Sequence, residues 1–398
     1  MDRDAARWSQ LALVSLALLA AMSAWFGLTA VGDLWTRRWQ LGPGQAAWLT
    51  TIVQVGFVAG TAGAALLNLA DIWPSRAYFA ASALLAAVSN ALLLAAPDYP
   101  TALALRFVTG VSFAGVYPPA MKMIATWFRS ARGFAIGAVV GALTIGKALP
   151  YLLDGLGGAT TGATVIVATS VGAALAGVAV FAGYRDGPHP FARRPFEWQR
   201  VGRILRHRPT MLATGGYLGH MWELYAGWLL ITPFFAAVFT ARGGTDPAAS
   251  GSLWGFAVIA VGGLGAVVAG IGADRWGRAR VASGAMLISG LGSVILGWLL
   301  HAPLWVVGTV AIVWGATIVA DSAQFSALVT EVAPPDAVGT ALTLQTMLGF
   351  ALTGVSMQLG VRVAESLGWG PAFTLLAVGP ALGMAAMRRL SLLPPHDV

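Results

Sequence analysis

A few ionisable side chains fall inside stretches of the sequence that are otherwise apolar and long enough to cross a membrane. A charged side chain at the centre of a bilayer costs about 2.5–3.5 kcal/mol on insertion scales. Four such groups left unpaired would cost on the order of 10 kcal/mol, so we expect them to face each other, a cavity or a substrate. The four groups are Arg106, Lys147, Glu223 and Asp321, and Lys122 also falls within one of these stretches.

The seventh apolar stretch has Glu223 near its middle, with His220 one turn earlier on the same helix face. Burial disfavours the charged form of a carboxyl, which suits a group that binds and releases protons. We interpret Glu223 as a proton-coupling group or a contact for a substrate cation. The alternative is a structural ion pair or hydrogen bond. His220 fits a proton relay or an ordinary hydrogen-bonding residue.

The tenth stretch has Asp321 two-thirds of the way along, with Gln324 one turn later and Trp314 two turns earlier. Polar and aromatic residues at this spacing form one stripe along a helix. We therefore predict that Asp321 and Gln324 line a transport pathway. Without the neighbouring polar residues, Trp314 would indicate only side-chain packing.

The fifth stretch has Lys147 on the same face as Tyr151 and Asp154. Two functional interpretations of Lys147 stay open: its ammonium binds an anionic substrate, or it pairs with a coupling acid and is released by substrate. The alternative is an intrahelical pair with Asp154. Lys122 lies near a helix end, where its side chain can reach the membrane surface.

The fourth stretch aligns Arg106 with Phe113 and Tyr117 on one face. A guanidinium binds planar anions such as carboxylate or nitrate through two parallel hydrogen bonds. We expect Arg106 and Tyr117 to belong to the substrate or coupling site.

The composition requires a membrane around these residues. Hydrophobic types make up 57% of the 398 residues and charged types only 10%, whereas soluble domains average about 25% charged. The chain has no cysteine, which excludes disulfides, thiolate metal sites and thiol catalysis. We expect twelve transmembrane helices of about 20 residues each. They lie near 9–34, 45–68, 77–96, 101–127, 133–153, 162–184, 210–239, 250–272, 281–301, 304–330, 338–363 and 371–390.

Arginines in the loops set the orientation, since cytoplasmic loops are richer in Lys and Arg. With both termini in the cytoplasm, seventeen arginines lie inside and four outside. A basic segment, 185–209, separates an N-terminal six-helix bundle (1–184) from a C-terminal one (210–398). Attraction to anionic lipid suits this linker. The basic residues are scattered at helix ends, so the net charge of +8 indicates no nucleic-acid partner.

An internal repeat supports the division into halves. Residues 270–280 contain Ala-Asp-Arg followed by Gly-Arg, and 68–76 contain a degraded copy with Asp71 and Arg76. Repeated halves with sites near the membrane midplane are the architecture of many secondary transporters.

With these motifs, the chain resembles the major facilitator superfamily over essentially its whole length. The resemblance implies an all-α integral membrane protein of two pseudo-symmetric six-helix bundles. It also implies a monomer and a conformational latch at the loop motifs. In the first copy, Trp-Pro-Ser stands where Gly-Arg is expected. The latch residues would be Asp71, Arg76, Asp274, Arg275 and Arg278.

The segment 127–133, with Trp-Phe followed by Arg-Gly, is similar to the nitrate/nitrite, cyanate and organic-anion porter branches. Residues 141–142 are Gly-Ala, which departs from the pattern of drug/proton antiporters. No nucleotide-binding loop, metal-ligand cluster or nucleophile motif is present in the sequence. We therefore expect no enzyme and no cofactor.

The sequence thus predicts a proton-coupled secondary transporter that moves a small anion, inorganic or carboxylate, by alternating access. We expect it in a bacterial-type inner membrane, as a symporter with protons and a small molecule as its ligands. The alternative is a proton-coupled exporter of lipophilic or cationic compounds.

Overall fold

A computed structural model describes residues 3–129, 131–157, 162–189 and 196–394. Helices are the only regular elements in these residues. The N-terminal half contains α1 (Arg3–Ala30), α2 (Gly32–Trp39), α3 (Pro43–Leu66), α4 (Leu69–Ile72), α5 (Ser75–Ala91), α6 (Tyr99–Phe113), α7 (Tyr117–Ala125), α8 (Arg132–Gly157) and α9 (Gly162–Gly183). After α10 (Trp198–Arg206), the C-terminal half contains α11 (Arg208–Thr240), α12 (Pro247–Trp276), α13 (Arg278–Leu296), α14 (Leu304–Thr317), α15 (Ser322–Val332), α16 (Val338–Leu367), α17 (Trp369–Leu376) and α18 (Val378–Ser391).

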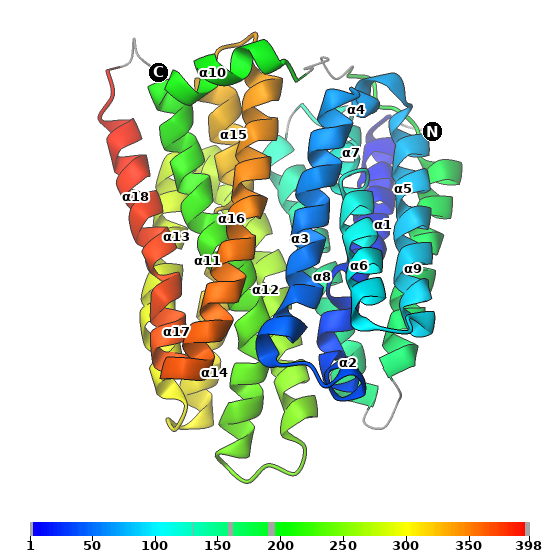
Figure 1. Cartoon of the computed structure of the whole chain (residues 1–398). Coiled ribbons are helices and arrows are strands. Elements are labelled where there is room, and N and C mark those ends of the chain that lie inside the picture. The colour runs from blue at the N-terminus through cyan, green and yellow to red at the C-terminus, as the bar shows by residue number, and fades with distance from the viewer. Residues whose placement is uncertain (1–2, 130, 158–161, 190–195, 395–398) are drawn as a thin grey trace.

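Eleven helices in the described residues are long and apolar enough to cross a membrane. The predicted span 101–127 is absent from that set because it is divided between α6 and α7. With that broken span, the chain has the predicted twelve, arranged as two side-by-side bundles (Figure 1). The start of α1, the end of α18 and α10 lie at one end of the bundles, here called the terminal face (Figure 1). The opposite end is the distal face.

Two spans at corresponding positions in the halves are interrupted. The fourth breaks at 114–116 between α6 and α7, and the tenth breaks at 318–321 between α14 and α15. Pro118 and Pro119 lie in the first turn of α7, and proline lacks the N–H that a continuous helix would need. Interrupted helices at matching positions of repeated halves point to the functional region of a transporter. The breaks carry Tyr117 and Asp321 at their ends.

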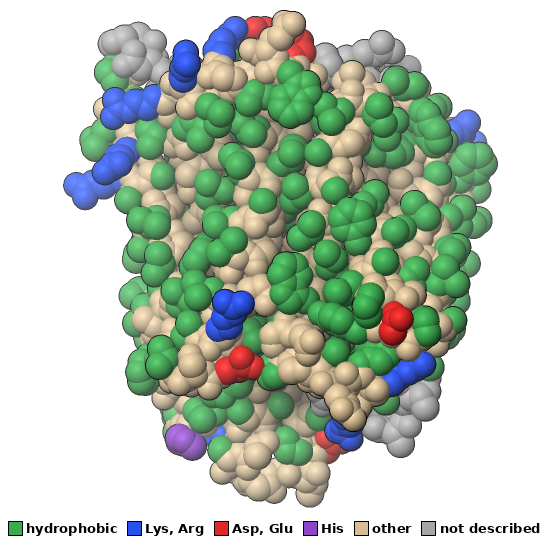
Figure 2. Space-filling model, in the orientation of Figure 1, with side chains coloured by type: hydrophobic (Ala, Val, Ile, Leu, Met, Phe, Trp, Pro, Cys, Tyr) green, Lys and Arg blue, Asp and Glu red, His purple; other side chains and the backbone are tan. Residues whose placement is uncertain are grey.

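The two halves meet along two helix pairs. Glycines let α8 and α12 approach closely: a Cβ at Gly141 would lie 2.7 Å from the carbonyl oxygen of Gly263. On the second pair, Gln358 of α16 donates a hydrogen bond of 2.9 Å to the Thr51 hydroxyl of α3. The face in Figure 2 is apolar over its middle, with most Lys and Arg side chains toward its ends, as lipid contact requires.

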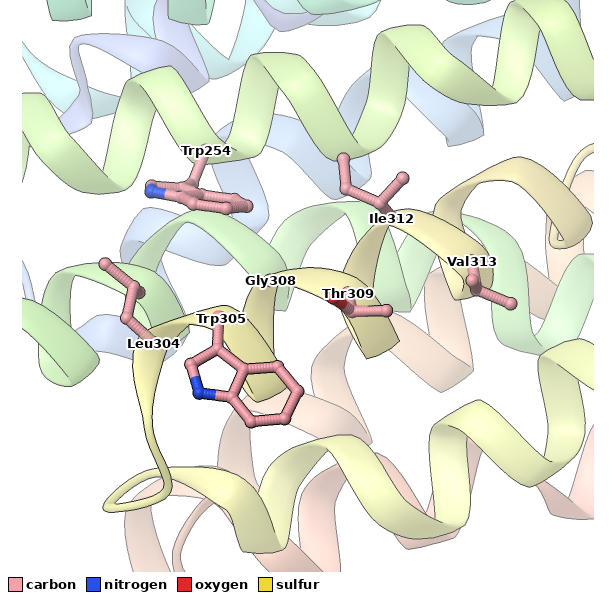
Figure 3. Close-up of a pocket in the computed structure, with 7 residues that line it drawn as sticks. All are labelled: Trp254, Leu304, Trp305, Gly308, Thr309, Ile312 and Val313. Atoms are coloured by element: carbon pink, nitrogen blue, oxygen red, sulfur yellow. The ribbon is translucent and has the colours of Figure 1, made fainter.

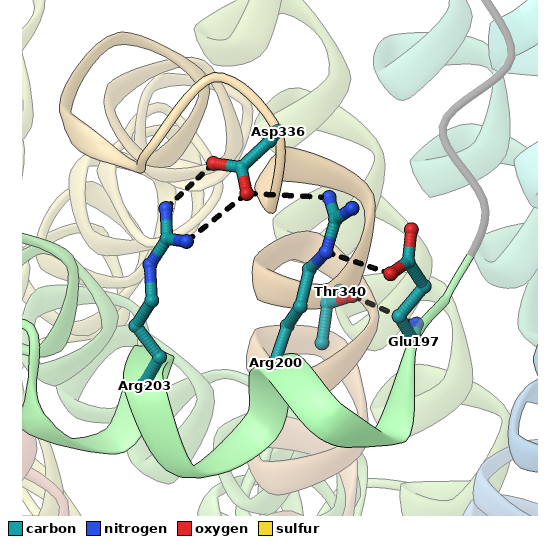
Figure 4. Close-up of polar contacts among 5 residues, drawn as sticks. All are labelled: Glu197, Arg200, Arg203, Asp336 and Thr340. Atoms are coloured by element: carbon teal, nitrogen blue, oxygen red, sulfur yellow. Dashed lines mark hydrogen bonds and ion pairs between the residues drawn. The ribbon is translucent and has the colours of Figure 1, made fainter.

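Helix α10 is held at the terminal face by ion pairs (Figure 4). Arg203 donates two hydrogen bonds, of 2.6 and 3.0 Å, to the Asp336 carboxylate in the loop before α16. Arg200 lies 2.7 Å from Glu197 and 3.6 Å from Asp336. The linker is therefore anchored to the C-terminal half.

Candidate substrate and proton sites

The ammonium of Lys147 lies between the two halves, enclosed by aromatic rings. Its Nζ is 3.9 Å from the ring centroid of Trp25 on α1, 4.6 Å from Tyr225 and 5.7 Å from Trp228, both on α11. It also donates a hydrogen bond to the Tyr225 hydroxyl. Only 1% of Lys147 is exposed. We call Trp25, Tyr225 and Trp228 the aromatic cage.

Further rings support the cage from both halves. Trp25 stacks on Phe113 at 5.0 Å between centroids, with the planes 15° apart. Phe350 of α16 lies 5.4 Å from the Tyr225 ring and 4.3 Å from the Phe57 ring of α3. The cage is thus built on helices of both halves, and rearrangement of the halves would alter it.

Lys147 has no carboxylate within ion-pair distance among the described residues. The alternative of an intrahelical pair with Asp154 is wrong for this conformation, because Lys147 bonds to Tyr225 on α11. Asp154 accepts a hydrogen bond of 2.6 Å from Ser252 on α12. The interpretation that a coupling acid pairs with Lys147 is likewise not what this conformation shows. A buried ammonium without a counter-charge is costly. An anionic ligand bound beside Lys147 would lower this cost.

Three neighbouring side chains carry buried polar atoms for which the described residues offer no hydrogen-bond partner. They are the indole N–H groups of Trp25 and Trp228 and the amide of Gln54. Gln54 lies one turn before Phe57, whose ring is 5.5 Å from Trp25. An unsatisfied buried polar group costs about 1–3 kcal/mol. Two of the cage residues and the nearby Gln54 thus carry donors that have no partner in the described structure.

Arg106 occupies a different position from the one we expected. Its guanidinium donates to three backbone carbonyls: Leu49 at 3.0 Å, Ala24 at 3.0 Å and Trp25 at 2.5 Å. These bonds tie α6 to α1 and α3. In this conformation Arg106 positions Trp25 of the cage, and each of its three guanidinium nitrogens is held by a backbone carbonyl.

Glu223 lies inside the C-terminal half, away from the cage. Its carboxylate accepts hydrogen bonds from Ser289 at 2.8 Å, Ser293 at 2.7 Å and the Trp314 indole at 3.2 Å. No cationic side chain pairs with it among the described residues, which favours the hydrogen-bonded alternative over an ion pair. Since Tyr225 follows by two positions, the helical repeat of 3.6 residues places the two side chains on different faces of α11.

His220 and Asp321 form another buried polar contact in the C-terminal half. The Nδ1 of His220 lies 2.7 Å from Oδ1 of Asp321, and the two side chains are 1% and 3% exposed. The distance is that of an ion pair, although the alignment is not that of a hydrogen bond. Gln324 is also buried, with its Oε1 unpaired in the described part of the chain. The break at 318–321 thus brings Asp321 to the face of α11 that carries His220.

Tyr117, at the start of α7, is close enough to Tyr217 and Tyr225 of α11 to interact electrostatically. Both are in the other half, so Tyr117 lies at the interface between the halves. The outer surface has a separate groove between α12 and α14 (Figure 3). It is lined by Trp254, Leu304, Trp305, Gly308, Thr309, Ile312 and Val313, none of them charged. The groove has no charged side chain to select a charged ligand, whereas the cage holds Lys147.

Comparison with known proteins decides the family. The Major Facilitator Superfamily model matches residues 13–357. The chain belongs to this superfamily. A niacin transporter from Acinetobacter baylyi is 30% identical over 92 residues, which is 23% of this chain and 20% of that protein's length. The predicted family, all-α fold and absence of enzymatic activity are therefore confirmed, because the superfamily consists of transporters.

Solved structures of superfamily transporters share the fold. A bacterial homologue of the human lysosomal transporter Spinster, inward-facing and unoccupied, has a TM-score of 0.71 at 15% identity, covering 98% of this chain and 99% of its own. The proton:xylose symporter XylE also has a TM-score of 0.71, at 14% identity over 98% and 97%. The nucleoside transporter NupG has a TM-score of 0.70 at 12% identity, covering 96% of this chain and 98% of its own.

The superfamily loop motif places Asp274 against the other half. A Cβ at Gly133, in the first turn of α8, would lie 2.6 Å from the Asp274 carboxylate, where the positive end of the helix dipole attracts it. Gly277 of the motif has φ of +85°, which favours glycine. Arg278 bonds to Glu331 at 2.6 Å, within its own half.

The remaining latch candidates make no contact between halves in the described structure. Arg275 is exposed, and Arg76 lies over the Phe181 ring of α9 at 5.9 Å, within the N-terminal half. The Asp71 side chain lies outside the described part of the structure. Asp274 is therefore the latch candidate that contacts the other half.

Sequence reasoning missed the cage aromatics Trp25, Tyr225 and Trp228, and it missed Gln54. Tyr225 and Trp228 are three positions apart, so their shared face was visible in the sequence. Their meeting with α1 and α8 was not, because it depends on how the two halves pack.

Proposed function

We propose that this superfamily member is a proton-coupled transporter that carries a small anion between its two halves by alternating access. The observation that carries the proposal is Lys147, a buried ammonium without a carboxylate partner in the described residues, enclosed by rings from both halves. A substrate anion supplies the missing charge when it binds there. Opening on either side then exposes the cage to one compartment at a time.

Proton coupling is assigned to the C-terminal half. Glu223 and His220, the partner of Asp321, both lie on α11, the helix that also carries Tyr225 and Trp228. Protonation of Glu223 would change its bonds to α13 and α14 and so alter how α11 packs. Substrate and proton would therefore act on one shared helix, rather than through a direct acid–lysine pair.

The proposed topology places the terminal face in the cytoplasm of a bacterial-type cell, across the inner membrane. Seventeen arginines on the cytoplasmic side against four on the other support it. The moving units are the bundles 1–184 and 210–398, joined by the linker 185–209, in a monomer.

A thermal-shift screen of the detergent-purified protein tests the proposal. Small anions are compared with lipophilic cations on the wild type, Lys147→Ala and Glu223→Gln, because a ligand that binds only the folded state raises the melting temperature. Stabilisation by an anion that is lost in Lys147→Ala supports the anion site. Stabilisation by cations that is lost in Glu223→Gln overturns it.

The second candidate is the export of lipophilic or cationic compounds, which the aromatic cage favours because ring faces attract cations. However, Lys147 already occupies these ring faces and would repel a second cation. The anion assignment is therefore the better supported of the two.

A further inference from the structure

We infer that the substrate is a monocarboxylate with a flat, apolar body. This inference rests on the proposed function and names the substrate class of the same site. Three features of the cage select this class: the number of cations without an anionic partner, the spacing of the rings, and the presence of unpaired donors among aromatic side chains.

The charge of the site matches a single negative charge. Among the described residues, the partners of Lys147 are the Tyr225 hydroxyl and ring faces, whereas each of the three guanidinium nitrogens of Arg106 bonds a backbone carbonyl. In the described residues, the cage thus presents one cation without an anionic partner. A dianion would bring a second charge into an apolar enclosure and leave it unpaired, which is costly.

The ring geometry favours a flat body. The centroids of Trp25 and Tyr225 lie 5.9 Å apart, with planes inclined at 32°. Carbon atoms pack at about 3.5 Å, so a planar ring between two rings needs about 7 Å. The Lys147 ammonium lies over the faces of these same two rings, so a flat body enters between them when the halves separate slightly and the ammonium turns toward the ligand's carboxylate. A puckered ring of similar size needs a larger separation.

The surroundings favour an apolar body with one polar head. The neighbouring side chains are aromatic: Phe57, Phe113 and Phe350. Apolar surface on the ligand gains from burial among them, whereas nitrate or cyanate has little such surface. A carboxylate can accept about four hydrogen bonds, which suits the Lys147 ammonium and the unpaired indole N–H groups of Trp25 and Trp228.

The test is a ligand panel measured by thermal shift and by equilibrium binding at constant pH and ionic strength. Benzoate is the flat monoanion, cyclohexanecarboxylate the puckered one, terephthalate the flat dianion, benzamide the flat neutral compound, and nitrate the small inorganic anion. We expect benzoate to bind about fivefold or more tightly than cyclohexanecarboxylate, the scale of one aromatic contact. Benzamide and terephthalate should bind more weakly than either benzoate or cyclohexanecarboxylate.

Two matched variants test the cage itself. Trp25→Phe and Trp228→Phe keep an aromatic ring but remove the indole N–H. Each should weaken benzoate binding severalfold and keep the preference for benzoate over cyclohexanecarboxylate. Trp305→Phe, on the outer groove, is the control and should bind benzoate like the wild type. Melting temperatures without ligand show whether each variant is folded.

The outcomes separate this inference from the proposed function. If nitrate binds more tightly than benzoate, and Lys147→Ala abolishes its binding, the anion site stands and the flat-monocarboxylate class is wrong. Equal binding of benzoate and cyclohexanecarboxylate also overturns the class. If no anion binds and lipophilic cations do, both the class and the proposed function fall.

Discussion

Lys147 and Tyr225 meet across the boundary between the two halves: the ammonium on α8 donates a hydrogen bond to the hydroxyl on α11. This contact links the halves at the cage, and it occupies the cation that a substrate anion would bind. An entering anion must compete with the Tyr225 hydroxyl for Lys147. Substrate binding would thereby loosen a bond that holds the halves together.

Removing this competitor should strengthen anion binding. In Tyr225→Phe the ring face remains but Lys147 loses its hydroxyl partner, and such a bond contributes about 1 kcal/mol. We expect the Kd for the anion to fall about fivefold, while the unliganded protein melts at a lower temperature. Tyr151→Phe, another buried tyrosine on the Lys147 face of α8, is the control. Weaker anion binding in Tyr225→Phe would contradict competition at Lys147.

Arg106 should prove important for stability because of its backbone bonds. A lysine at this position cannot form the same three bonds to Leu49, Ala24 and Trp25, and each bond to a charged donor contributes about 1.5–3 kcal/mol. Arg106→Lys should therefore lower the free energy of unfolding by about 3 kcal/mol, measured by denaturant titration in detergent. A direct substrate role predicts the opposite pattern, with unchanged stability and lost binding.

Glu223 should couple transport to protons without forming the anion site. Glu223→Gln keeps the size of the side chain and a hydrogen-bonding group toward Ser289 and Ser293, but it cannot ionise. We expect anion binding within about twofold of the wild type, because the cage is unchanged. We also expect uptake that no longer responds to a pH gradient in proteoliposomes.

Glu365→Gln, an exposed acid on α16, is the control for Glu223→Gln and should keep normal coupling. Normal pH dependence in Glu223→Gln would remove Glu223 from the mechanism. The same assay on Asp321→Asn would then show whether the His220–Asp321 pair carries the proton.

The twelve spans and two halves could be predicted from the sequence because apolar length and charge position are local properties. The breaks in the fourth and tenth spans were harder to see, since apolar residues continue through 114–116 and 318–320. The partners of Arg106 could not be predicted either: its three acceptors are backbone atoms of α1 and α3. His220 and Asp321 were both candidates, but their contact depends on the packing of α11 against α15.

The anchoring of α10 should depend on the ionised form of Asp336. Hydrogen bonds from Arg203 hold the pKa of Asp336 below its ordinary value of 3.8. Because the pKa of the carboxyl is lowered, the contact stabilises the anchored helix fully above pH 3.8. This stabilisation is lost as the pH falls through the lowered pKa. Asp336→Asn should therefore release α10 at neutral pH.

Hydrogen–deuterium exchange over 198–206 measures this release, because anchored amides open less often. We expect faster exchange in Asp336→Asn at pH 7, and in the wild type only in strong acid. Arg206→Gln, on the exposed side of α10, should exchange like the wild type. Unchanged exchange in Asp336→Asn would show that other contacts hold the helix.

Proton movement upon anion addition is the most direct test of the central claim. Proteoliposomes that contain a trapped pH indicator are given benzoate or nitrate, and the initial rate of internal pH change is recorded for the wild type and Lys147→Met. Protein-free liposomes correct for passive entry of the acid. The account predicts that anion entry carries protons inward in the wild type and that Lys147→Met abolishes this signal while remaining folded. Proton movement driven by lipophilic cations and unaffected by Lys147→Met would contradict it.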